Sequence, residues 1–139
     1  MMVVDASVVV AALADSHEAG RVARERLRAA DDLAAPQLLD LEVVSVLRRM
    51  VFHGLISPHQ AQLAVTDLGN LDVDRWDHGG LVQRVWELRD ALSAYDAAYV
   101  ALAEEIGCPL LTGDAKLAKG AEHARSAAEI EVLTAGGAP

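Results

Sequence analysis

The sequence of 139 residues contains a single cysteine, Cys108, and only 4% aromatic residues. One cysteine excludes an internal disulfide framework and fits a reducing compartment. No segment approaches the roughly 18 consecutive apolar residues that a transmembrane helix requires. The N-terminus lacks a basic region and reaches the acidic Asp5 too soon for a signal peptide. These absences predict a cytoplasmic protein without membrane association.

Positive charge is also scarce, because 12 Lys and Arg residues stand against 21 Asp and Glu residues, a formal net charge of −9. Proteins that coat nucleic acid are usually basic, since neutralising phosphates supplies most of their non-specific affinity. The acidic balance therefore argues against such a module. It is compatible with an enzyme whose acids bind divalent cations, and with a basic polypeptide as partner.

Aliphatic residues are abundant, and the hydrophobic fraction of 53% excludes a disordered chain. The length fits one domain with one substantial core. We predict that this domain spans residues 1–133 and that residues 134–139 form a flexible tail.

Short apolar segments alternate with helical patterns along the chain. Strands are predicted at residues 2–4, 33–35, 71–74, 108–112 and 130–133. Helices are predicted at residues 8–13, 16–30, 38–52, 57–68, 81–92, 93–106 and 115–119. We expect Ser16 or Asp15 to cap the second helix, and Gly69-Asn70 to form a turn. The alternation indicates an α/β fold with a parallel sheet covered by helices on both faces.

Four acids stand out by their positions in this pattern. Asp5 ends the first strand and Asp114 follows the fourth, and ligands of open parallel sheets bind outside the carboxyl ends of the strands. Asp96 lies in the first turn of the helix that begins at Ser93, and Glu42 interrupts an apolar helical stretch. Converging carboxylates repel one another and raise pKa values, a cost that a hard cation such as Mg²⁺ removes.

Other metals and common enzyme classes are disfavoured by the motifs. The five histidines are dispersed, without an HxxxH or CxxC pair, so a zinc site is not indicated. The sequence contains no GxSxG, Walker A or GxGxxG motif.

Each acid also has a structural interpretation. Asp5 and Asp114 are suited to cap the helices that follow them, and Asp96 follows Ser93 in a Ser-x-x-Asp capping pattern. Glu42 is harder to explain structurally, because a buried acid needs a partner. We assign Tyr95 and Tyr99 to the core rather than to base stacking, and Asp40 to solvent or a cap.

Four segments, taken together, resemble the PIN-domain family, and specifically the VapC-type toxins of toxin–antitoxin pairs. They are Val3-Val4-Asp5-Ala6-Ser7, residues 35–43 around Glu42, residues 92–103 with Tyr-Asp-x-x-Tyr-Val-Ala-Leu-Ala, and Leu111-Thr112-Gly113-Asp114-Ala115-Lys116-Leu117. The resemblance implies a three-layer fold with a five-stranded parallel sheet. It implies an endoribonuclease that binds Mg²⁺ or Mn²⁺ through Asp5, Glu42, Asp96 and Asp114. It further implies a homodimer and a cognate VapB-like antitoxin whose basic tail occupies the pocket.

In one respect the sequence departs from part of that family. Some members carry a further acid shortly after the position of Asp114, where this chain has Ala115-Lys116-Leu117, so the number of metal ions stays open. Ser7 and Thr112 are candidate hydroxyl contacts in the pocket. The candidate phosphate contacts are Lys116, Arg48 and Arg89.

Three rival functions are considered. A receiver domain usually has two neighbouring acids after its first strand, and a phosphatase of the haloacid dehalogenase type needs Asp-x-Asp there. This chain has Asp5-Ala6-Ser7 at that point, which disfavours both. The third rival, a non-catalytic PIN fold used only for binding, is disfavoured by the complete set of four acids.

Overall fold

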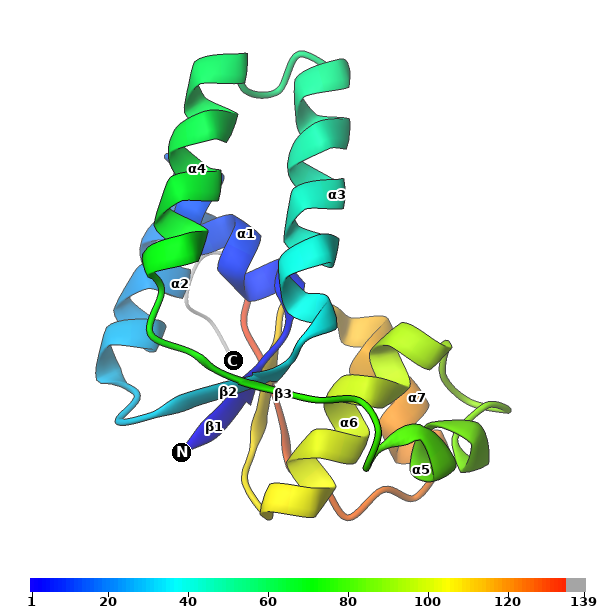
Figure 1. Ribbon diagram of the computed structural model, residues 1–139. Coiled ribbons are helices and arrows are strands. Elements are labelled where there is room, and N and C mark those ends of the chain that lie inside the picture. Colours follow the sequence, from blue (N-terminus) through cyan, green and yellow to red (C-terminus); the bar gives the residue numbers. More distant parts are fainter. Residues whose placement is uncertain (135–139) are drawn as a thin grey trace.

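A computed structural model describes residues 1–134, and its centre is a five-stranded parallel sheet in the order β3-β2-β1-β4-β5 (Figure 1). The strands are β1 (Met2–Val4), β2 (Leu33–Pro36), β3 (Asp74–Trp76), β4 (Leu110–Thr112) and β5 (Ile130–Val132). The predicted fold class is confirmed. Of the predicted tail, Thr134 is described, and residues 135–139 lie outside the described part of the chain.

The structure has seven helices within residues 1–134. They are α1 (Ala6–Ala14), α2 (Glu18–Ala29), α3 (Leu38–Phe52), α4 (Pro58–Asn70), α5 (Val82–Glu87), α6 (Ala94–Ile106) and α7 (Ala115–His123). Figure 1 shows α1 and α2 on one side of the sheet and α6 and α7 on the other. The helices α3 and α4 form an antiparallel pair that extends away from the sheet. No helix in this part of the chain has the length and apolarity needed to cross a membrane.

The central strands are buried on both faces, which explains their purely apolar sequences. Every residue of β1 is buried, and so is every residue of β4. On α6 all residues from Ala97 to Ala103 are buried. Because this helix packs on the middle strands, small alanine side chains let it approach the sheet closely. The central strands and α6 therefore form much of the hydrophobic core.

Several predicted boundaries differ from the structure. The third strand begins at Asp74 instead of Leu71, and α5 ends at Glu87 instead of Leu92. The prediction of a turn at Gly69-Asn70 is wrong, because both residues belong to the last turn of α4. A single glycine costs a helix only about 1 kcal/mol, so packing of Leu68 and Ala64 against the core extends the helix through it.

The predicted cap of α2 is also wrong in detail. The N-cap residue is His17, whose side chain makes no capping hydrogen bond. The carboxylate of Asp15 instead accepts a hydrogen bond of 2.7 Å from the backbone N–H of His17, one residue before the helix. By contrast, Ser57 and Gln60 form the capping box expected where Pro58 begins a helix.

The side chain of Asp40 is 39% exposed, and it also forms an ion pair with Arg75 that the sequence did not predict. The Arg75 guanidinium lies 2.9 Å from Asp40 Oδ2, and it donates further hydrogen bonds to the carbonyls of Leu68 and Val73 at 3.0 and 3.2 Å. The ion pair links the first turn of α3 to the end of α4 and to β3. Nearby, the first N–H of α3, from Leu38, donates to His78 Nε2 at 3.0 Å. These contacts fix the N-terminal end of α3.

Replacing Arg75 with methionine is therefore expected to destabilise the fold. Arg75→Met keeps much of the aliphatic stem but leaves Asp40 and the carbonyl of Val73 without the Arg75 donor, and it removes one of the two donors to the carbonyl of Leu68. The free energy of unfolding should fall by about 1–3 kcal/mol, measured by urea denaturation. Arg28→Met is the control, because Arg28 is exposed and has no hydrogen bond or ion pair within residues 1–134. Equal stability losses in both variants would contradict the role of Arg75.

Candidate active site

Two of the four predicted acids lie where the neighbouring strands β1 and β4 end. Asp5 is the N-cap of α1, and its Oδ1 accepts hydrogen bonds from the backbone N–H of Ser7 at 3.0 Å and of Val8 at 3.4 Å. Asp114 is the N-cap of α7 and accepts from the N–H of Lys116 at 2.9 Å. Both acids therefore have the capping roles that the sequence suggested. The parallel pairing of the strands also brings them to the same edge of the sheet.

The structure brings all four acids together in one pocket of about 380 Å³. Glu42 reaches it from α3 and Asp96 from the first turn of α6. The complete lining is Asp5, Ala6, Ser7, Val10, Glu42, Val46, Asp96, Tyr99 and Asp114. This lining contains four carboxylates and no lysine, arginine or histidine.

Two hydroxyl groups donate hydrogen bonds to the Asp5 carboxylate, one to each oxygen. Thr112 Oγ1 accepts a hydrogen bond of 2.9 Å from the N–H of Asp114 and donates one of 2.6 Å to Asp5 Oδ2. Ser7 Oγ accepts one of 2.9 Å from the N–H of Gly113 and donates to Asp5 Oδ1. Because each hydroxyl oxygen already accepts from a backbone N–H, its own proton is left to point at the carboxylate.

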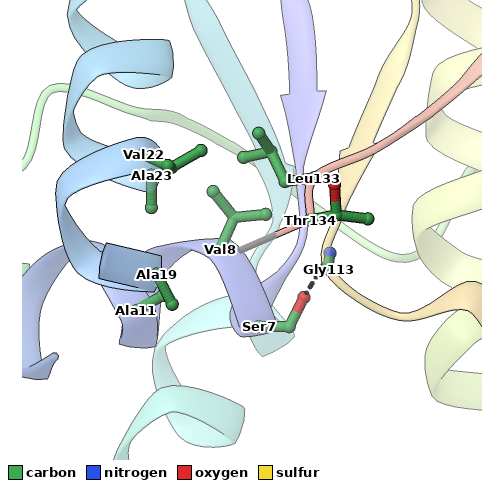
Figure 2. Close-up of a pocket in the computed structure, with 9 residues that line it drawn as sticks. All are labelled: Ser7, Val8, Ala11, Ala19, Val22, Ala23, Gly113, Leu133 and Thr134. Carbon is green, nitrogen blue, oxygen red and sulfur yellow. Dashed lines mark hydrogen bonds between the residues drawn. The ribbon is translucent and has the colours of Figure 1, made fainter. Parts of the chain in front are cut away.

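The bond between Ser7 and Gly113 is drawn in Figure 2. It stands at the wall of a second, mainly apolar pocket lined by Val8, Ala11, Val22, Leu133 and others between α1, α2 and the end of the described chain. Ser7 therefore separates an acidic pocket from an apolar one. The Asp5 side of this contact is buried, whereas Ser7 itself is exposed.

Glu42 has a partner that the sequence interpretation missed. The hydroxyl of Tyr99 donates a hydrogen bond of 2.7 Å to Glu42 Oε1. The Tyr99 ring belongs to the core as predicted, with only 1% of the residue exposed, but its hydroxyl lines the acidic pocket. The sequence offered one indication of this role: Asp96 and Tyr99 are three residues apart on α6 and therefore share a face of the helix. The assignment of Tyr95 to the core is wrong, since Tyr95 is 65% exposed.

Burial and mutual repulsion disfavour the ionised acids. Desolvation is the main cause of a raised pKa at Asp5, and the hydrogen bonds from Ser7 and Thr112 oppose it. Desolvation also raises the pKa of Glu42, opposed by the bond from Tyr99 and reinforced by the charges of Asp96 and Asp5. The pKa of Asp96 is raised by desolvation and by the charges of Asp114 and Asp5. The pocket thus contains negative charge that lacks a positive partner.

This electrostatic excess fits a divalent cation. Among residues 1–134 no three acidic, histidine or cysteine side chains form a preassembled metal cage. Mg²⁺ does not require such a cage, because it keeps several of its waters and takes one or two carboxylates directly. The donor set, made only of carboxylate and hydroxyl oxygens, also favours a hard ion.

The candidate phosphate contacts lie outside the lining of the acidic pocket. The guanidinium of Arg89 stacks over the ring of Trp86 at 4.3 Å, and that of Arg48 over the ring of Phe52 at 4.7 Å. Lys116 is exposed in the first turn of α7, two residues after Asp114. Of these three cations, Lys116 is the nearest to the acids along the chain.

Comparison with known proteins gives the family. The model of the PIN domain matches residues 2–123. The chain belongs to the PIN-domain family. Within that family, the chain is 42% identical over 117 residues to VapC ribonuclease Mb0985 of Mycobacterium bovis. This alignment covers 84% of this chain and 88% of that protein. It is 39% identical over 133 residues to ribonuclease VapC12 of Mycobacterium tuberculosis, and the alignment covers 96% of this chain and 99% of that protein. It is therefore a VapC-type PIN domain.

A solved structure supports the same fold. The chain superimposes with a TM-score of 0.65 on a chain of the complex described as VapBC2 from Rickettsia felis bound to a DNA fragment from their promoter. The match covers 96% of this chain and 98% of that one at 14% sequence identity. Such a likeness without close sequence identity shows the shared fold. The fold implied by the resemblance in the sequence is therefore confirmed.

Replacing Thr112 with valine removes the hydroxyl but keeps the shape. Thr112→Val leaves Asp5 Oδ2 and the N–H of Asp114 without their partner, so the free energy of unfolding should fall by roughly 1.5–3 kcal/mol near neutral pH. The loss should shrink in acid, where Asp5 is protonated in both variants. Thr66→Val on the exposed face of α4 is the control. A loss of the same size at every pH would contradict a charge-dependent contact.

The raised pKa of Glu42 predicts a pH effect on the metal-free protein. A carboxyl whose pKa is raised by folding stabilises the native state at low pH, and this contribution disappears as the pH rises through the folded-state pKa. In EDTA, Glu42→Gln should therefore raise the melting temperature at neutral pH relative to the parent protein. The difference should vanish near pH 4. A variant less stable than the parent at neutral pH in EDTA would contradict the proposed charge excess.

Proposed function

We propose that this protein is a Mg²⁺-dependent endoribonuclease toxin that hydrolyses RNA phosphodiester bonds at the acidic pocket. The observation that carries the proposal is the gathering of Asp5, Glu42, Asp96 and Asp114 in one pocket without a basic side chain. The pocket belongs to a chain whose relatives are named VapC ribonucleases. VapC-type PIN ribonucleases depend on a divalent metal ion, and Mg²⁺, with Mn²⁺ as its substitute, is our choice for this chain.

In this proposal Asp5, Asp96 and Asp114 hold the metal, and Glu42 completes its shell. When bound, the ion supplies charge neutralisation at the phosphodiester and a water of lowered pKa as nucleophile. Asp5 is the most rigid of these groups, because backbone and hydroxyl donors fix both of its oxygens. Asp114 is anchored by its cap to α7. Ala115 and Leu117 add no further acid, so we propose one tightly held ion.

Substrate contact requires cations outside the acidic pocket. Lys116 is the best placed by sequence and exposure, since it follows Asp114 and is free to turn toward a phosphate. Ser7 and Thr112 are committed to Asp5, so we assign them to positioning that acid rather than to binding RNA. Because the proposed substrate is cellular RNA, we place the activity in the cytoplasm.

We further propose that a VapB-like antitoxin inhibits the enzyme and that the toxin is a homodimer. The matching Rickettsia felis structure is that of a VapBC2 assembly. A basic tail suits both the uncompensated pocket and the net charge of −9. Large apolar side chains that face solvent on α3, such as Leu41 at 76% and Phe52 at 74% exposed, are available for protein contacts.

Cleavage of RNA by the purified protein tests the proposal. We expect Mg²⁺-dependent cleavage that EDTA abolishes, and a loss of roughly 100-fold or more in rate for Asp5→Asn and for Asp96→Asn. Asp67→Asn is the matched control, because Asp67 is an exposed acid on α4 outside the pocket. Cleavage that persists in EDTA and in both pocket variants would overturn the mechanism. Well-folded protein that binds RNA without cutting it would favour the non-catalytic PIN fold.

A further inference from the structure

Tyr99 is a core residue whose polar atom opens into the acidic pocket. Its ring is packed on α6 with 1% of the residue exposed, among side chains where a phenylalanine would fill the same space. Its hydroxyl nevertheless lines the pocket and lies 2.7 Å from Glu42 Oε1. Within residues 1–134 it is the one hydrogen-bond donor to the Glu42 carboxylate.

The need for such a donor follows from the position of Glu42. Asp5 and Asp114 stand at helix N-termini, where unpaired backbone N–H groups hold their carboxylates. Glu42 is the fifth residue of α3, so the N–H groups around it are engaged inside the helix. Its side chain also has one more rotatable bond than aspartate. The donor that fixes it is a side chain from another element, Tyr99.

Tyr99 provides this hydrogen-bond donor from α6, the helix that carries Asp96. The two residues are three apart on α6, so one rigid helix presents a carboxylate and a phenol on the same face. The phenol takes Glu42 Oε1 as its acceptor. The second oxygen, Oε2, has no hydrogen bond from residues 1–134.

We propose that Tyr99 is a positioning residue for Glu42: its hydroxyl binds Oε1 and leaves Oε2 as the oxygen that contacts the divalent ion. The inference rests on the proposed function, since it takes Glu42 as part of the metal shell. Tyr99 itself contacts neither the ion nor the RNA. We expect its effect on metal binding to pass through Glu42.

Isothermal titration calorimetry of the metal-free protein with Mn²⁺, in the absence of RNA, tests this inference. Tyr99→Phe should weaken Mn²⁺ binding by roughly 10-fold, the range found when a group that orients a metal ligand is removed. Glu42→Gln should also weaken it. In the Glu42→Gln background, Tyr99→Phe should cause no further loss, because the group through which it acts is already neutral.

Tyr95→Phe is the matched control, since Tyr95 lies one turn earlier on α6 and is 65% exposed. Near-ultraviolet circular dichroism establishes that each variant keeps the native packing. Wild-type Mn²⁺ affinity in Tyr99→Phe, beside weak binding in Glu42→Gln, would overturn the inference and leave the proposed function standing. The inference would also be overturned if Tyr99→Phe weakened Mn²⁺ binding equally in the parent protein and in the Glu42→Gln variant. Unchanged binding in Glu42→Gln would instead remove Glu42 from the proposed metal shell, and the inference with it.

Discussion

The pairing of β1 with β4 is the constraint on which the site depends. Val3 and Val4 align with Leu110 and Leu111, and the N–H of Asp5 continues the ladder with a bond of 3.1 Å to the carbonyl of Leu111. This register places Thr112 beside Asp5, so that its hydroxyl can reach the carboxylate. A shift of one residue would turn Thr112 to the other face of the sheet and break the contact.

The same groups both stabilise and destabilise the fold. Asp5 caps α1 and Asp114 caps α7, contributions that favour the folded chain. Their convergence with Glu42 and Asp96 in a partly dehydrated pocket opposes folding, as the raised pKa values of Asp5, Glu42 and Asp96 indicate. The buried apolar strands and α6 offset this cost. The acidic pocket is thereby maintained at the expense of some stability, a common trade-off at functional sites.

The sequence located Asp5 and Asp114, two of the four acids that line the pocket, because strand ends can be recognised from the sequence. Apolar runs that stop at Asp5 and at Thr112 locate two strands, and parallel strands expose their carboxyl ends at one edge. Glu42 was singled out because an acid in an apolar helix face needs a partner, but that partner was not identified. Tyr99 looked like an ordinary core aromatic, since a periodic pattern reports burial of a ring and not the direction of its hydroxyl. The ion pair of Asp40 with Arg75 was not predicted either, because the two residues are far apart along the chain and adjacent only in the fold.

By itself the sequence determined the α/β class, the alternation of strands and helices, and the set of acids with their capping roles, because these depend on local periodicity and on neighbours a few residues apart. Tertiary structure decided which groups meet. The order β3-β2-β1-β4-β5 placed β1 next to β4, and the fold brought Glu42 of α3 within hydrogen-bond distance of Tyr99 on α6. It also extended α4 through Gly69, since packing energy exceeded the small helical cost of one glycine. Contacts between residues distant in sequence depend on register and packing, which no local pattern encodes.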